Sequence, residues 1–181
     1  MANKEYKSIQ EALKSARFFA SPIELIDQHQ YLKEKPDQIR ASLFRASLCE
    51  IARIDDLLKG TVIYFSFVAS KDPIFSLIKL LRNFQVQLVP HQLENVEIEV
   101  TSGSDFMVYK NYIASNITLH EFQKLRDFHK YEYSQIEKLI LWFDENQRKL
   151  GVTQFLYSLI KYVDTHLVER LNKHRKLNKN L

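Results

Sequence analysis

The sequence predicts an all-α protein, a bundle of five to seven helices with one small two-stranded β-hairpin inserted at about residues 95–112. Turn residues are scarce, with 3 glycines and 4 prolines among 181 residues, whereas sandwiches and barrels need many tight turns built on such residues. Apolar side chains also recur at helical spacing in several long stretches. One short stretch alternates between apolar and charged residues, as a strand does.

The first helix is expected at residues 4–19, where apolar residues recur with a helical period. The sequence Ser21-Pro22-Ile23-Glu24 follows it. Serine can cap a helix, proline suits the first helical position, and a glutamate three residues after the cap can bond back to the cap amide. This pattern predicts a second helix from Ser21 to about Lys35.

The third helix is expected to begin at Pro36 and to end near Gly60. Thr61–Val68 is rich in β-branched and aromatic residues and fits either a strand or a buried continuation of the helix, because periodicity does not separate the two in so short a run. In Asp72-Pro73 a capping residue precedes a proline at the first helical position. The strongly apolar helix that follows should end just before Pro90.

The β-hairpin is predicted from one alternating segment and its continuation. Apolar residues at 96, 98 and 100 alternate with Glu97 and Glu99, and Thr101–Asp105 has the composition of a turn. A second extended run, Phe106–Tyr112, completes the pair. A lone hairpin is marginally stable in water, so it should pack against the helices or pair with a partner chain.

The C-terminal half should be helical again. Thr118-Leu119-His120-Glu121 has the residues of a capping box. The helical region behind it should reach about Leu150, with a break near His129-Lys130. Gly151 should end it, and the last helix should run from about Val152 into a basic tail.

The net charge of +4 is concentrated in that tail. Five Lys and Arg residues and no acidic residue follow Glu169, which leaves −1 on the rest of the chain. The tail, from about residue 170, is either a solvated helix end that suits the helix dipole or a surface that contacts phosphates. In the second case the candidate binding residues are Arg170, Lys173, Arg175 and Lys176.

Composition indicates one domain, residues 1–181, in a reducing compartment. Hydrophobic residues make up 45% and charged residues 27%, which is ordinary for a globular domain. The single cysteine, Cys49, cannot form an internal disulfide. The first ten residues lack an apolar leader, and the longest apolar run, Thr61–Ala69, is far short of the roughly 20 residues of a spanning helix. We therefore expect a cytoplasmic protein without a membrane partner.

Most enzymatic signatures are absent. Three scattered glycines cannot build a phosphate-binding loop, no Gly-x-Ser-x-Gly elbow occurs, and one cysteine excludes zinc sites with two or more thiolates. His166 and Glu169 have the spacing of two ligands on one helix face, but a single such pair is common on helix surfaces. We expect neither a metal nor a cofactor.

The feature that most suggests function is a cation and an amide, Arg82-Asn83, in the middle of the most apolar helix. An unpaired buried guanidinium is strongly unfavourable, so Arg82 needs an ion-pair partner, a groove or a ligand. Gln87, four residues after Asn83, shares its face of the helix. The structural alternative is that Arg82 pairs with Asp55 or Asp56 and ties two helices together.

Leu81-Arg82-Asn83-Phe84 resembles the first half of the motif of HEPN domains, the nucleotide-binding helical domains of higher eukaryotes and prokaryotes. That motif is an Arg, usually followed by a polar residue, with a His a few residues later on a bundle helix. The pattern of residues 44–58 also resembles an earlier helix of these domains, and the likeness covers roughly residues 36–92. The resemblance implies a domain that often dimerises, in toxin–antitoxin or phage-defence systems, where an antitoxin-like protein is a possible partner. Active members are metal-independent endoribonucleases, in which the Arg and His assist attack of the ribose 2′-hydroxyl on the phosphodiester.

The chain departs from this motif where the His is expected, because Gln87 stands five residues after Arg82. An amide does not exchange protons near neutral pH, whereas imidazole does. We therefore expect a non-catalytic, homodimeric HEPN-like module that binds RNA, a nucleotide or a protein through Arg82, Asn83, Gln87 and the basic tail. One alternative is an active endoribonuclease that uses Arg82, Asn83 and His91. The other is an unrelated helical protein with a structural or interaction role.

Overall fold

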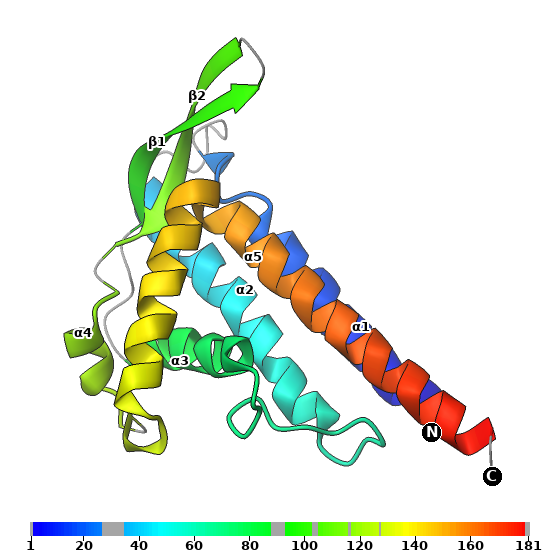
Figure 1. Ribbon diagram of the computed structural model, residues 1–181. Coiled ribbons are helices and arrows are strands. Elements are labelled where there is room, and N and C mark those ends of the chain that lie inside the picture. Colours follow the sequence, from blue (N-terminus) through cyan, green and yellow to red (C-terminus); the bar gives the residue numbers. More distant parts are fainter. Residues whose placement is uncertain are drawn as a thin grey trace.

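The computed structural model describes residues 2–26, 35–87, 93–102, 105–115, 117–126 and 128–179. Three helices come first, followed by a two-stranded antiparallel sheet, a short helix and a long kinked helix (Figure 1). The predicted fold class, a helical bundle with a small inserted β-hairpin, is confirmed.

Helix α1, Ala2–Ala20, lies where the sequence predicts a first helix. The second helix predicted from Ser21 is wrong for residues 21–26, which form turns, and residues 27–34 lie outside the described part of the chain. Ser21 Oγ donates to the carbonyl of Phe18, 3.1 Å away, so this hydroxyl caps the end of α1 instead of the start of a new helix. The amide of Leu25 bonds to the carbonyl of Pro22, three residues back, as in a turn.

Helix α2, Pro36–Leu58, begins at the predicted proline, and Gly60 follows its end with a positive φ of 81°. Residues 61–72 form neither the strand nor the helix that the sequence left open, but turns and irregular backbone. This segment is nevertheless anchored, because the ring of Phe67 is fully buried and its amide donates to Asp55 Oδ1 at 2.8 Å.

Helix α3, Pro73–Gln87, is capped as predicted, because Asp72 Oδ1 accepts a hydrogen bond from the amide of Ile74 at 3.0 Å. Its buried face includes Leu77, Ile78 and Leu81. Pro90, the predicted stop, lies outside the described residues.

The hairpin consists of β1, Leu93–Ser102, and β2, Asp105–Ala114. The strands pair from Leu93 with Ala114 to Ser102 with Asp105, so the hairpin is a few residues longer than predicted. Its base lies against the helices and its far end projects beyond them (Figure 1).

Two side-chain amides fix the base of β2. Gln147 donates to the carbonyl of Ala114 at 2.9 Å and accepts from its amide at 2.8 Å. Asn111 accepts from the amide of Tyr112 at 2.8 Å and donates to the carbonyl of Leu150 at 3.2 Å. These bonds attach β2 to the long C-terminal helix, residues 133–179.

After the hairpin come α4, Leu119–Gln123, a 3-10 turn at Phe128–Lys130, and α5, Tyr133–Lys179. Thr118 caps the start of α4 as predicted, because the amide of Glu121 donates a hydrogen bond to Thr118 Oγ1 at 3.3 Å. Gly151 interrupts α5 with φ 73° and ψ 161°, and the two halves diverge from it (Figure 1). The predicted helix boundary at this glycine is therefore present.

The second half of α5, residues 152–179, runs beside α1 in the opposite direction (Figure 1). Gln10 Nε2 donates to Asp164 Oδ1 across this contact at 3.1 Å. Apolar side chains of α1, α2, α3 and α5 form one core together with residues of the connecting segments. Its fully buried aromatic rings are those of Phe44, Phe67, Phe75, Phe122, Phe143 and Phe155. Within the described residues, no helix combines the length and apolar character that crossing a membrane requires.

Candidate functional site

Arg82 and Asn83 are both half-buried on α3. Arg82 Nη1 donates to Asn83 Oδ1 at 3.0 Å, so the cation and the amide of the predicted site contact each other. Gln87 is exposed at the end of the helix, and His91 lies outside the described residues.

The ion pair that ties α2 to α3 is made by Lys79 and not by Arg82. Lys79 Nζ lies 2.8 Å from Asp55 Oδ2, and both side chains are largely buried. Asp56 instead pairs with Lys59 at 2.6 Å on the surface. The hydrogen bond from Lys59 lowers the pKa of Asp56, and the more distant charges of Lys79 and Arg82 act in the same direction.

The polar side chain that α3 buries most deeply is Gln85, which the sequence analysis did not single out. It is 1% exposed, and neither of its amide atoms has a hydrogen-bond partner among the described residues. Gln85 lines neither of the two cavities described below, so this amide forms no part of those sites.

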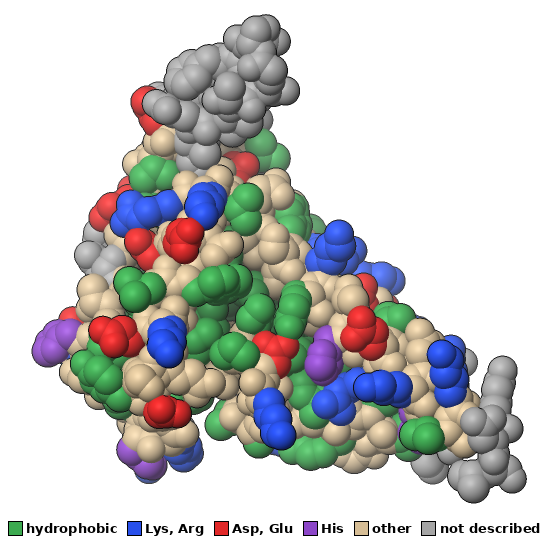
Figure 2. All heavy atoms as spheres, viewed as in Figure 1, with side chains coloured by type: hydrophobic (Ala, Val, Ile, Leu, Met, Phe, Trp, Pro, Cys, Tyr) green, Lys and Arg blue, Asp and Glu red, His purple; other side chains and the backbone are tan. Residues whose placement is uncertain are grey.

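The basic tail continues α5 as a regular helix and lines a groove of about 600 Å³. We call this the basic groove. It is lined by three cations, Arg170, Lys173 and Lys176, and by one carboxylate, Glu169. Arg175 is exposed but does not line it. Figure 2 shows basic side chains along this part of α5.

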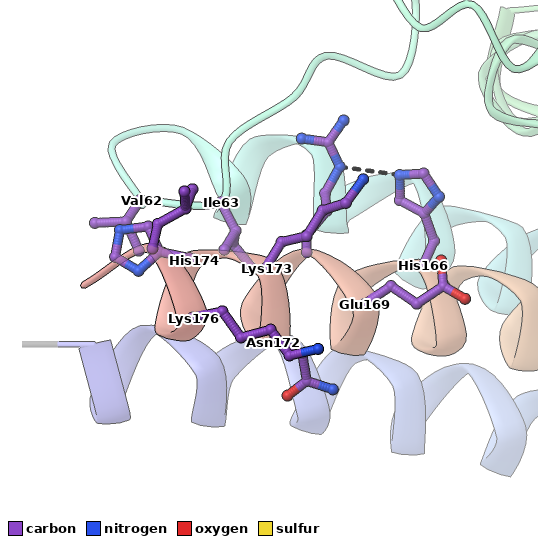
Figure 3. Close-up of a pocket in the computed structure, with 10 residues that line it drawn as sticks. Val62, Ile63, His166, Glu169, Asn172, Lys173, His174 and Lys176 are labelled. Atoms are coloured by element: carbon purple, nitrogen blue, oxygen red, sulfur yellow. Dashed lines mark hydrogen bonds between the residues drawn. The ribbon is translucent and has the colours of Figure 1, made fainter. Parts of the chain in front are cut away.

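The opposite wall of the basic groove comes from the segment after α2. Val62 is 61% exposed there, and Ile63 lies beside it with its side chain buried. In Figure 3, Lys173 points to the same flank of α5 as His166, whereas Lys176 follows the flank nearer α1. The groove therefore combines cations on two flanks of one helix with an apolar wall.

Arg170 is held in a defined orientation. Its Nε donates to His166 Nε2 at 3.0 Å (dashed line in Figure 3), and its guanidinium lies over the ring of Phe65, 4.2 Å from the centroid. The imidazole of His166 packs on the rings of Phe65 and Phe75, with both centroids 4.9 Å away. An imidazole nitrogen that accepts a hydrogen bond carries no proton, so this arrangement requires neutral His166. Burial, and then the charge of Arg170, lower the pKa of His166, which agrees with that state.

A second depression, of about 470 Å³, lies on the other side of His166 and shares Glu169 with the basic groove. Tyr162 lines it and donates its hydroxyl hydrogen to Asp72 Oδ2. This hydrogen bond, with burial and the negative charge of Asp72, raises the pKa of Tyr162 to about 12. Asp72 therefore caps α3 through one oxygen and holds Tyr162 through the other.

The structure does not bring the two predicted sites together. Asp72 and His166 mark the point where the start of α3 meets α5, and Arg82 follows Asp72 by ten residues. At 1.5 Å per residue, Arg82 lies roughly 15 Å along α3 from that point. The Arg82-Asn83 pair and the basic groove are therefore separate features.

The chemistry of the basic groove suits an anion. Guanidinium and ammonium groups bind phosphate oxygens, and arginine can do so with two parallel hydrogen bonds. Fixing Arg170 in advance reduces the entropy lost when it binds a ligand. The described residues contain no group of three or more His, Cys, Asp or Glu side chains that could hold a metal ion.

The cations of this site were predicted from the sequence, but His166 was considered there only as a possible metal ligand with Glu169, and its role in orienting Arg170 was missed. Tyr162, His166 and Arg170 follow one another at intervals of four, a spacing that places them on one helix face. This spacing could have indicated from the sequence that the three side chains interact. The contact of Phe65 with Arg170 could not be predicted in the same way, because the segment that carries Phe65 has no regular structure.

Comparison of the chain with protein-family models, with curated proteins and with solved structures found no match.

Proposed function

We propose that this protein is a helical binding module that holds the phosphates of a single RNA strand in the basic groove. The observation that carries the proposal is the fixed guanidinium of Arg170, which is supported by His166 and Phe65 and has Lys173 beside it in the same groove. A solvated helix end would not need such support. Val62 and Ile63 give the groove an apolar wall, which suits the bases of an unpaired strand better than a free inorganic anion.

The proposal includes the expectation that the protein is a HEPN-like domain. It is supported by the helical bundle and by the half-buried Arg82-Asn83 pair on α3. Gln87 provides no ionisable group where the motif has His, so the proposal is for binding and not for cleavage. In this view Arg82, Asn83 and Gln87 form a second contact surface, for an antitoxin-like partner or for a second copy of the chain in a cytoplasmic homodimer.

The test is binding of a fluorescently labelled oligouridylate at several salt concentrations. Three phosphate contacts on a single strand predict a slope of about −2 in log K against log salt, or an affinity loss of about 20-fold between roughly 50 and 200 mM salt. The Arg170→Ala/Lys173→Ala double variant removes two of the three contacts and should reduce the slope to about −0.7.

Arg175→Ala provides the matched control, because it removes one cation of the same tail that does not line the groove. It should leave affinity and slope close to those of the unmodified protein. Equal losses in this control and in Lys173→Ala would mean that only overall charge matters, and no binding at low salt would refute the proposal. The same RNA, examined for breaks in the presence of EDTA, tests the expectation that the protein does not cleave it.

A further inference from the structure

The contact between His166 and Arg170 is unusual because both partners are basic side chains. The hydrogen bond at 3.0 Å exists only while Nε2 of His166 carries no proton. With its Nε committed to His166 and its plane resting on Phe65, Arg170 retains its two terminal nitrogens for a ligand. Neutral His166 therefore positions the cation on which the proposed function depends.

We infer that neutral His166 positions Arg170 while the basic groove is empty and that His166 becomes a proton-linked contact once phosphate binds, so that phosphate in the basic groove favours protonation of His166. The inference rests on the proposed function and assigns a regulation to the same site. A protonated imidazole presents an N–H where the neutral ring presents a lone pair. Protonation breaks the hydrogen bond from Arg170 to His166, and a phosphate oxygen that takes the place of this bond would accept from both side chains.

The groups around His166 set the direction of this linkage. Arg170 and Lys173 on α5 oppose a positive charge on the ring, whereas Glu169 on α5 and Asp72 before α3 favour it. The apolar rings of Phe65 and Phe75 exclude water from one side. In the free protein burial and Arg170 dominate, and the pKa of His166 is lowered from its ordinary value of 6.5.

A bound phosphate adds negative charge next to both cations, so it must raise the pKa of His166. Linkage then requires that phosphate binds more tightly to the protonated form. Affinity should therefore increase as the pH falls through the range of His166. A rise of one pKa unit corresponds to about tenfold tighter binding to the protonated form.

The direct test is a proton NMR titration of the histidine ring signals, with and without inorganic pyrophosphate. The His166 signal is assigned by its loss in His166→Gln. Pyrophosphate should shift the midpoint of this signal to higher pH, and it should leave the signal of His120, which lies on α4 outside the groove, in place. An unchanged His166 midpoint under saturating pyrophosphate would overturn the inference.

Oligouridylate binding separates the two roles of His166. Glutamine retains an acceptor for Arg170 but cannot take up a proton, so His166→Gln should lose most of the increase in RNA affinity that the unmodified protein shows on acidification from about pH 8. His166→Leu removes the acceptor and should bind several-fold more weakly at both pH values. His174→Gln tests the other histidine of the groove and should retain the part of the pH dependence that His166→Gln removes.

The outcomes distinguish this inference from the proposed function. If neither RNA nor pyrophosphate binds, the proposed function itself fails. If RNA binds with the expected salt slope but the pH dependence disappears in His174→Gln and persists in His166→Gln, the function stands and the role given to His166 is refuted. His120→Gln, a matched loss of one histidine, should change neither affinity nor pH dependence.

Discussion

Replacing Gly151 with alanine should destabilise the protein by disturbing the contact between α5 and the hairpin. The backbone at Gly151 has φ 73° and ψ 161°, a region that is almost exclusive to glycine and costs about 1–3 kcal/mol for another residue. An added Cβ would also lie 2.1 Å from Cγ and Oδ1 of Asn111. Asn111 would then have to move away from the carbonyl of Leu150 and lose a hydrogen bond worth about 1 kcal/mol. The sum is about 2–4 kcal/mol for Gly151→Ala.

A double-mutant cycle separates backbone strain from the clash. Asn111→Ala alone should cost about 1–2 kcal/mol, because it removes the bonds to Leu150 and to the amide of Tyr112. In the double variant the side chain of Asn111 no longer clashes with the added Cβ at residue 151. The hydrogen bonds of Asn111, whose loss contributes to the cost of each single variant, are counted only once in the double variant. The combined cost should therefore be smaller than the sum of the single costs by about 1 kcal/mol.

The assay is urea unfolding followed by far-ultraviolet circular dichroism, with the m value compared between variants. An unchanged m value shows that the variants differ in stability and not in the extent of the folded state. A cost below about 0.5 kcal/mol for Gly151→Ala would refute the argument, since it would mean that neither the strain nor the clash exists. Additive single costs would refute the steric part alone.

Three further predictions follow from buried or shared polar groups. Asp55→Ala should cost about 3 kcal/mol in urea unfolding, because it leaves the largely buried Lys79 without its partner; a loss below about 1 kcal/mol would mean that the pair is solvated. Gln147→Ala should cost about 2–3 kcal/mol, since it orphans a buried strand amide and carbonyl, whereas unchanged stability would show that water replaces the side chain. Tyr162 has a pKa raised to about 12, so its stabilising effect is present below the ordinary tyrosine pKa of about 10 and is lost as the pH rises toward 12. Ultraviolet difference spectra should therefore show that Tyr162→Phe removes a late-ionising tyrosine and that Asp72→Asn makes that tyrosine ionise earlier; titration of Tyr162 with the other tyrosines would contradict this.

Local signals were sufficient for most of the helices. Pro36 and Asp72 start α2 and α3 because a fixed φ and a capping oxygen act within one turn, independently of the rest of the fold. Thr118 does the same for α4. The sequence at Ser21 predicted a helix start equally well, but the prediction was wrong, because a serine hydroxyl can either cap the start of a helix or bond to the last turn of the preceding one. Its hydrogen bond to the last turn of α1 prevailed.

The candidate site was less predictable, since it depends on contacts between distant segments. The cations from residue 170 onward could be predicted from charge alone. The position of Arg170 over Phe65 could not be predicted, because the two lie 105 positions apart in the sequence and Phe65 is in an irregular segment. Arg82 was predicted to need a partner, but which carboxylate faces which cation between α2 and α3 depends on the rotation of both helices. In the structure it is Lys79, and not Arg82, that pairs with Asp55.

The side-chain bonds at the base of β2 also affect how this protein can associate with others. An edge strand with unpaired amides is a template for strand addition and aggregation. At the base of β2, Gln147 occupies the outward amide and carbonyl of Ala114, and Asn111 occupies the amide of Tyr112. An incoming strand would have to displace three formed hydrogen bonds before it made its first. These two amides therefore protect the hairpin against growth of the sheet at the place where it is anchored.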